Sequence, residues 1–256
     1  MRKIFLIAVG IVALAACGGG GDSGADSAPA TSAPPAAAAT VDPATAGTIT
    51  GKITLEGEPS DMDVIQMAAD PNCAKMHDSP VQAQFVVVGE GGGLANAFVH
   101  IKSGLNGSFP APSEPALLDQ QGCIYVPHVI GLQVGQPLKI RNSDATLHNI
   151  HATPSNNKEF NIGQPVQGLE TERTFDAVEV MVPFKCDVHK WMNSYAGVVD
   201  HPYFAVTDAN GDFSMDNVPP GEYTVEVWHE KFGTQEMSVS LGESATAEAN
   251  GSYTAS

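Results

Sequence analysis

Three side chains that bind soft metal ions lie close together near residue 190 of this 256-residue chain. Cys186, His189 and Met192 follow one another at intervals of three residues, directly after an apolar segment. A loop that curls back lets side chains at this spacing converge on one point, and His148 and His151 offer imidazoles upstream. Thiolate, thioether and two imidazoles suit copper in a trigonal site with a weak axial methionine, whereas structural zinc sites do not use thioether.

The segment before Cys186 alternates with the period of a β-strand. Val178, Val180, Val182 and Phe184 share one face, and Cys186 continues it. We therefore expect the thiol to point into the apolar interior at the end of this strand. Each of these residues, taken alone, is more often part of an ordinary core than a metal ligand. Their joint occurrence with an inward-facing cysteine favours copper.

The two upstream histidines compete for one place in the predicted site. If residues 147–152 are extended, His148 and His151 lie on opposite faces of the strand. Only one of them can then reach the metal, and alternation by itself does not say which.

Taken in order, these motifs resemble the cupredoxin family, particularly its amicyanin and plastocyanin branch. Those proteins carry a His-Asn pair after a strand ending in Asn, then Cys-x-x-His followed closely by Met, and residues 124–199 hold both motifs. The His-Asn pair selects His148. The resemblance implies that Asn149 ties the two ligand loops together and hydrogen-bonds near the sulfur. The copper ligands that it implies are His148, Cys186, His189 and Met192.

Both ends of the folded part resemble a second family, the carboxypeptidase regulatory-like β-sandwich, which is transthyretin-like and non-catalytic. The resemblance rests on Gly-Lys-Ile-Thr from Gly51, Thr-Asp-Ala-Asn-Gly-Asp-Phe from Thr207 and Val-Pro-Pro-Gly-Glu-Tyr-Thr-Val from Val218. It implies an all-β chain in which a cupredoxin-like Greek-key barrel or sandwich is inserted in, or packed beside, a small β-sandwich. The expected domains are a sandwich of residues 48–106 and 201–256, and a copper domain of residues 107–200.

Short alternating segments between turn signals agree with an all-β chain. Residues 204–213 predict a hairpin with Asn210-Gly211 at its tip. Residues 60–67 are the one place where a short helix is expected. The other predicted strands lie within residues 47–55, 85–88, 95–101, 132–142, 178–186, 223–228 and 237–241.

The N-terminus predicts export and a lipid anchor. Arg2 and Lys3 precede an apolar run, Ile4 to Ala16, which suits a signal-peptide core and is too short to span a bilayer. Leu-Ala-Ala before Cys17 resembles a bacterial lipobox, which implies cleavage of residues 1–16 and acylation of Cys17. Residues 17–47 then form a polar tether that holds the body at a membrane in the periplasm, and Gly18 favours the outer membrane.

The remaining cysteines predict a disulfide, and the net charge limits the kinds of molecule that the protein can bind. With Cys17 lipidated and Cys186 on the metal, Cys73 and Cys123 are expected to pair in an oxidising compartment. Twelve basic against 29 acidic residues give a net charge of −17, which excludes general nucleic-acid binding. The same charge favours a basic redox partner such as a c-type cytochrome.

These features predict an electron-transfer protein and no enzyme, because four protein ligands leave no open position on the metal. The imidazole edge of His189, on an exposed loop near Trp191 and Tyr195, is the predicted electron exit. Two alternatives remain. The same ligands could carry or sequester copper without redox turnover, or the sandwich could be a carbohydrate- or protein-binding module.

Overall fold

The structure is a computed structural model that describes residues 38–39, 41–59 and 62–255. Over these residues the chain forms 17 strands and only three short helical turns, which confirms the all-β prediction. None of the described sheets closes into a barrel. No helix among the described residues is long and apolar enough to cross a membrane. The predicted signal peptide, Cys17 and most of the tether lie outside this part of the chain.

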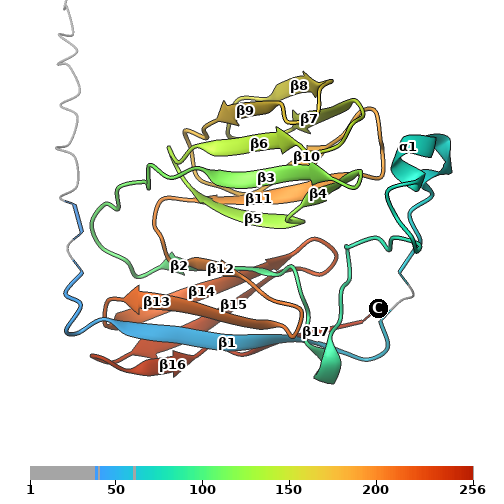
Figure 1. The fold of residues 1–256 in the computed structure, drawn as a ribbon. Coiled ribbons are helices and arrows are strands. Elements are labelled where there is room, and N and C mark those ends of the chain that lie inside the picture. The colour runs from blue at the N-terminus through green and yellow to red at the C-terminus, as the bar shows by residue number, and fades with distance from the viewer. Residues whose placement is uncertain (1–37, 40, 60–61, 256) are drawn as a thin grey trace, which may run out of the picture. The chain divides into compact units, whose positions relative to one another are not determined.

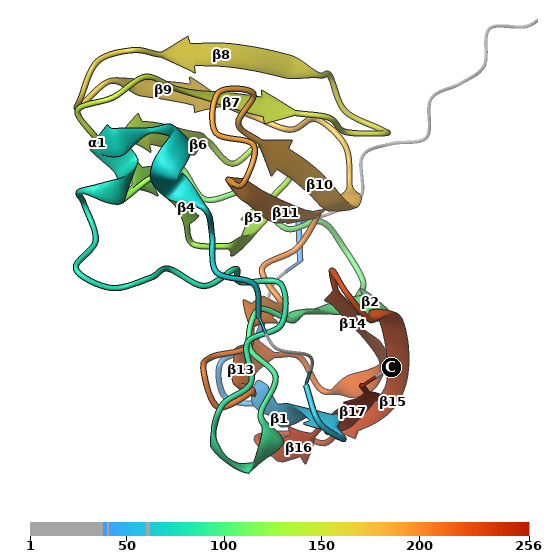
Figure 2. The same ribbon diagram turned by 90° about the vertical axis from the view of Figure 1, so that its right-hand side faces the viewer.

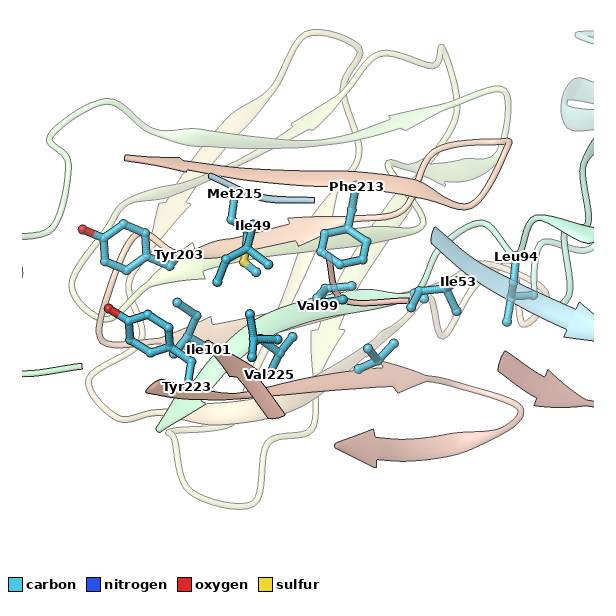
Figure 3. Packing of buried hydrophobic residues seen from close by; sticks show 14 of the residues in the cluster. Ile49, Ile53, Leu94, Val99, Ile101, Tyr203, Phe213, Met215, Tyr223 and Val225 are labelled. Carbon is cyan, nitrogen blue, oxygen red and sulfur yellow. The ribbon is translucent and has the colours of Figure 1, made fainter. Parts of the chain in front are cut away.

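One sandwich is built from both ends of the folded part (Figure 1). Its first sheet has the order β13-β1-β16, with β17 also paired to β1, and its second has the order β12-β2-β14-β15. Figure 3 shows the apolar side chains packed between the two sheets, among them Ile49, Val99 and Val225. The strands are β1 (Gly47–Glu56), β2 (Phe98–Ser103), β12 (Phe204–Val206), β13 (Asp212–Val218), β14 (Gly221–His229), β15 (Gly233–Leu241), β16 (Thr246–Glu248) and β17 (Gly251–Thr254).

The strands between β2 and β12 form a second sandwich (Figures 1 and 2). Its sheets have the orders β5-β11-β10-β7-β8 and β4-β3-β6-β9. Its own core includes Leu118, Ile140, Ile150 and Phe184. The strands are β3 (Ala116–Gln121), β4 (Ile124–Val126), β5 (Val129–Gln133), β6 (Leu138–Asn142), β7 (His148–Ala152), β8 (Phe160–Gln164), β9 (Glu170–Arg173), β10 (Glu179–Lys185) and β11 (Asn193–Val199).

A short helical segment covers one end of the second sandwich. It consists of η1 (Met67–Ala69) and α1 (Pro71–Ala74), so the helix begins where the predicted one over residues 60–67 ends. Asp70 caps α1 by accepting a hydrogen bond from the backbone N–H of Asn72, and Pro71 occupies the first helical position. A further helical turn, η2 (Glu90–Gly92), precedes β2.

The predicted hairpin over residues 204–213 is wrong. The turn exists, since the N–H of Gly211 donates to the carbonyl of Asp208, but its flanking strands belong to different sheets. β12 pairs with β2, and β13 pairs with β1. The chain therefore crosses from one sheet of the sandwich to the other at this turn. Local turn chemistry predicts the reversal of the chain, but which edge each strand pairs with depends on distant residues.

The predicted face of the strand before Cys186 is correct only at its end. Val182, Phe184 and Cys186 are buried in the core of the second sandwich. The register with β11 shifts between Glu179 and Val182, so Val180 packs in a different apolar cluster. Val178 precedes the strand and is exposed. A bulge breaks strict alternation, and the inward direction of Cys186 is fixed by the regular part after it.

β10 begins at a buried carboxylate that organises the preceding loop. Glu179 accepts hydrogen bonds from the backbone N–H groups of Ser155, Asn156 and Asn157, and from the side chain of Asn157. Burial raises the pKa of Glu179, but these hydrogen bonds outweigh it and hold the pKa below its usual value.

Replacing Glu179 should therefore destabilise the protein. In Glu179→Gln, an amide NH₂ would face N–H donors, so we expect the free energy of unfolding to fall by about 1–3 kcal/mol at neutral pH. A lowered carboxyl pKa stabilises the fold above its unfolded value of 4.5 and loses that effect as pH falls below it. Denaturant unfolding at pH 7 and pH 3 should show the difference shrink. Glu243→Gln, at an exposed site, is the control, and equal losses in both variants would contradict this role.

Candidate metal centre

Two histidines from separate elements face each other inside the second sandwich. His148 begins β7, and His189 lies in the loop between β10 and β11. Their Nδ1 atoms are 3.0 Å apart, and their exposed fractions are 0% and 3%. Cys186 completes the group, because its sulfur and one nitrogen of each imidazole all lie within 4.8 Å of one another. The structure thus brings together three of the four ligands implied by the cupredoxin resemblance.

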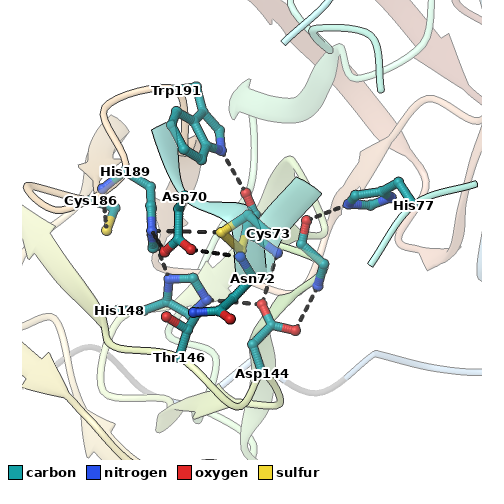
Figure 4. The surroundings of a disulfide bond; sticks show 12 residues. Asp70, Asn72, Cys73, His77, Asp144, Thr146, His148, Cys186, His189 and Trp191 are labelled. Atoms are coloured by element: carbon teal, nitrogen blue, oxygen red, sulfur yellow. Dashed lines mark hydrogen bonds and ion pairs between the residues drawn. A yellow bond between two sulfur atoms is a disulfide. The ribbon is translucent and has the colours of Figure 1, made fainter. Parts of the chain in front are cut away.

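A carboxylate contacts each imidazole at Nε2, on the side of the ring opposite Nδ1 (Figure 4). His148 Nε2 lies 2.9 Å from Asp144 Oδ2, and His189 Nε2 lies 3.0 Å from Asp70 Oδ2. Burial lowers the pKa of His148, but the bond to Asp144 and the neighbouring Cys186 raise it above its usual value. A carboxylate accepts a hydrogen bond from Nε2–H, which leaves the opposite ring nitrogen, Nδ1, directed at the centre.

The thiol of Cys186 lies among hydrogen-bond donors. The backbone N–H of His189 donates to its sulfur at 3.3 Å, and in the thiol form Sγ donates to Asn149 Oδ1, also at 3.3 Å. Burial raises the pKa of Cys186, but His148 and the surrounding N–H groups outweigh it and lower the pKa below its usual value. The structure therefore favours the thiolate, which is the form that binds metal.

Asn149 connects the two segments that carry the ligands. Its side-chain oxygen accepts hydrogen bonds from the backbone N–H groups of Asp187 and Val188, at 2.7 and 3.3 Å. Its side-chain NH₂ donates to Asn161 and to Asp187. One residue of β7 thus fixes the start of the loop that begins at Cys186, in the place that the resemblance implies for it.

The loop closes on itself at Met192. The backbone N–H of Cys186 donates to the carbonyl of Met192 at 3.1 Å, and the N–H of Met192 donates to the carbonyl of His189 at 2.9 Å. Met192 is 1% exposed and lies in the same apolar cluster as Cys186. The expected curl of this loop is therefore present, and it brings the backbone of Met192 against those of Cys186 and His189.

His151, the other upstream candidate, lies away from this group. Its two ring nitrogens contact Asp187 and Glu159 at 3.0 and 2.9 Å, in a partly exposed position. β7 is extended, so His148 and His151 differ in the direction of their side chains, as the alternation argument requires. The structure brings His148 to Cys186 and leaves His151 outside.

The predicted exposure of His189 is wrong. Cys73 and Cys123 form a disulfide whose Cys73 sulfur lies 3.6 Å from His189 Nε2, and Asp70 occupies the rest of that edge. Trp191 packs against the ring, with centroids 5.0 Å apart. Tyr195 belongs to a different apolar cluster. The helical segment around α1, about 115 residues away in sequence, covers the imidazole, and no local pattern could reveal this.

Asp70 and Asp144 are the residues that sequence reasoning missed. Asp144 precedes His148 by four residues and also accepts hydrogen bonds from the backbone N–H groups of Gly122 and Cys123, both at 2.8 Å. Asp70 has the local signature of a helix cap before proline, which gives no indication of a contact with His189. The disulfide connects the segments that carry the two aspartates. Cys73 follows Asp70 by three residues, and the backbone N–H of Cys123 donates to Asp144.

The donor set fits a soft cation. With both Nε2 atoms donating to carboxylates, both Nδ1 atoms present lone pairs to each other at 3.0 Å. Two acceptors at this distance repel each other unless a proton or a metal ion neutralises them. Two imidazoles and a thiolate, with the thioether of Met192 on the same loop, suit copper better than zinc, calcium or magnesium. Cys73 and Cys123 adjoin the site, but their sulfurs are used in the disulfide.

Comparisons with known proteins find the same two families that the sequence resembles. Residues 197–254 match the model of the carboxypeptidase regulatory-like domain. A purple cupredoxin from Nitrosopumilus maritimus is similar at 22% identity and a TM-score of 0.29, over 32% of this chain and 98% of its own. The Cu(I) form of an amicyanin mutant has 19% identity and a TM-score of 0.30, over 39% and 97% of the two chains. No curated protein matches in sequence.

Proposed function

We propose that this protein binds one copper ion at His148, Cys186, His189 and Met192, and that it transfers electrons. The observation that carries the proposal is the convergence of one nitrogen from each of two imidazoles and a cysteine sulfur in a buried cluster, each within 4.8 Å of the others. Copper would supply a one-electron change between its cuprous and cupric states at this site.

The chain's own residues suit that role and disfavour substrate chemistry. Asn149 and the hydrogen bond between Cys186 and Met192 fix the ligand loop, and Asp144 fixes His148. Since Cys186, His148 and His189 are at most 3% exposed, water and substrates are excluded from the centre. A rigid, dry set of four donors leaves no coordination position for a reactant, so we infer that the protein is not an enzyme.

Copper loading tests the proposal directly. The purified protein with Cu(II) should show an intense visible thiolate-to-copper charge-transfer band and narrow copper hyperfine splitting in its EPR spectrum. Cys186 is the one free cysteine among the described residues, so Cys186→Ala should abolish the band. His151→Ala removes a nearby imidazole outside the centre and should retain it. A colourless wild-type protein, or a band that survives Cys186→Ala, would contradict the proposal. Copper that binds but cannot be cycled reversibly would favour carriage instead.

Electrons would leave through Trp191 instead of a bare imidazole edge. Trp191 packs on His189 and lines a pocket of about 310 Å³ together with Lys190, Tyr125 and Met192. This pocket lies beside the ligand loop, so Trp191 connects the ring of His189 to a surface that a partner can reach. We infer that a redox protein docks there.

The net charge of −17 would steer a basic c-type cytochrome to this protein. Stopped-flow mixing of the copper-loaded protein with a basic cytochrome should give an association rate that falls about tenfold as salt rises from low to physiological concentration. An acidic cytochrome is the control and should not show this fall. A rate that is independent of salt with the basic cytochrome would exclude electrostatic steering.

We also infer that the protein is a lipoprotein anchored on the periplasmic side of a membrane. Residues 1–16 would be cleaved off, and Cys17 would be acylated. The support is the sequence alone: a short apolar run, a lipobox-like segment and a polar tether. Cys17→Ser should move the protein from the membrane fraction to the soluble fraction of the cell envelope. Cys186→Ser, which removes a different thiol, should leave it in the membrane fraction. Membrane retention of Cys17→Ser would show that the anchor is wrong.

A further inference from the structure

The carboxylate of Asp70 has two partners of different kinds. Oδ1 accepts the backbone N–H of Asn72 at 2.8 Å and so caps α1, whereas Oδ2 contacts His189 Nε2 at 3.0 Å. Figure 4 shows Asp70 between the short helix and the imidazole, next to the disulfide. A helix cap needs only one oxygen, so the second oxygen is left for the histidine.

The contact with His189 is sheltered. His189 is 3% exposed, and its Nε2 edge also lies 3.6 Å from the Cys73 sulfur. Cys73 belongs to α1 and is itself fully buried and joined to Cys123, so α1 cannot move away without breaking a covalent bond. The Asp70 side chain is 22% exposed, so solvent screens part of its charge, but the 3.0 Å contact with a buried ring leaves no room for water between the two groups.

We propose that Asp70 is a positioning residue for the copper centre: it holds His189 by Nε2 so that Nδ1 faces His148 and Cys186, and its negative charge favours the cupric over the cuprous ion. Only the effect of the Asp70 charge on the copper ion rests on the proposed function. Holding the ring is a property of the metal-free chain. A carboxylate on the far nitrogen of a ligand histidine fixes the tautomer and increases the basicity of the ligating nitrogen.

Asp144 does the same for His148, but it is less suitable for a test. It also accepts the backbone N–H groups of Gly122 and Cys123, so its replacement would disturb the turn that carries the disulfide. Asp70 can be changed with its cap preserved, because Asn and Ser are both good capping residues. Asp70→Asn keeps the shape and removes the charge. Asp70→Ser keeps the cap and is too short to reach His189.

The first measurement uses the metal-free protein at fixed pH. Nitrogen NMR of the histidine rings should show His189 Nε2 fully protonated in the wild type. In Asp70→Ser, its signal should move toward the range of an unprotonated nitrogen, because nothing then holds the proton there. Asp78→Asn, which removes an exposed charge from the same segment, should leave the signal unchanged. An unchanged His189 signal in Asp70→Ser would show that Asp70 only caps α1.

The second measurement is the reduction potential of the copper-loaded protein. Asp70→Asn and Asp70→Ser should each lower the ratio of Cu(II) to Cu(I) affinity about tenfold, which raises the potential by about 59 mV for a one-electron couple. Asp78→Asn should leave it within a few millivolts of the wild type. Equal potentials in the wild type and both Asp70 variants would overturn the electrostatic half of the proposal.

The two measurements separate this inference from the proposed function. If the wild type binds no copper with the thiolate band, the copper proposal fails, and the NMR measurement alone decides whether Asp70 holds the ring. If the band is present and the Asp70 variants shift the potential but leave the Nε2 signal unchanged, Asp70 does not hold the ring. Its charge then acts on the copper ion alone.

Discussion

Two imidazole nitrogens that face each other at 3.0 Å are the constraint around which the second sandwich is organised. Both rings are buried, so water has no access to this contact, and the thiol of Cys186 is the neighbouring polar group. β7 supplies one ring, and the loop after β10 supplies the other. Asn149 keeps these two elements in register, and the loop from Cys186 to Met192 is closed by its own backbone. A proton or a cation between the two nitrogens would be bound by both rings at once.

Three acidic groups lie around the centre, and their negative charge also has to be stabilised. Asp70 and Asp144 contact the Nε2 atoms of the two rings, and Cys186 lies near both rings, with its pKa lowered. Buried charges of one sign are costly unless they are paired with the other. Hydrogen bonds from backbone N–H groups stabilise part of this charge, and a bound cation would stabilise the rest. The charges around the site, like its geometry, therefore favour binding of a cation.

The sequence predicts most of what lies close in the chain and little of what does not. The spacing of Cys186, His189 and Met192 predicts a curled loop, because three-residue steps are local, and the loop is present. His148 is brought to that loop because an extended strand turns alternate side chains to one face. The disulfide between Cys73 and Cys123 is present as the cysteine count predicts. The domain limits at residues 107 and 200 stay a prediction.

What could not be predicted depends on long-range packing. Asp70 contacts a residue 119 positions away, and its local pattern indicates only a helix cap. The hairpin prediction failed because β12 and β13 select partners, β2 and β1, that lie about 100 and 160 residues earlier. The exposure of His189 depends on the same kind of contact. Sequence periodicity gives the direction of a side chain but not what covers it.

The pairing of β1 makes the chain hard to shorten. β1 lies beside β13, β16 and β17, and β2 lies beside β12 and β14, so the residues before the second sandwich are held by residues after it. A protease or a premature stop codon that removed the last fifth of the chain would strip β1 of every strand that borders it. The first sandwich would also lose the core side chains that β13 to β17 supply, so a chain cut at this point could not keep this fold.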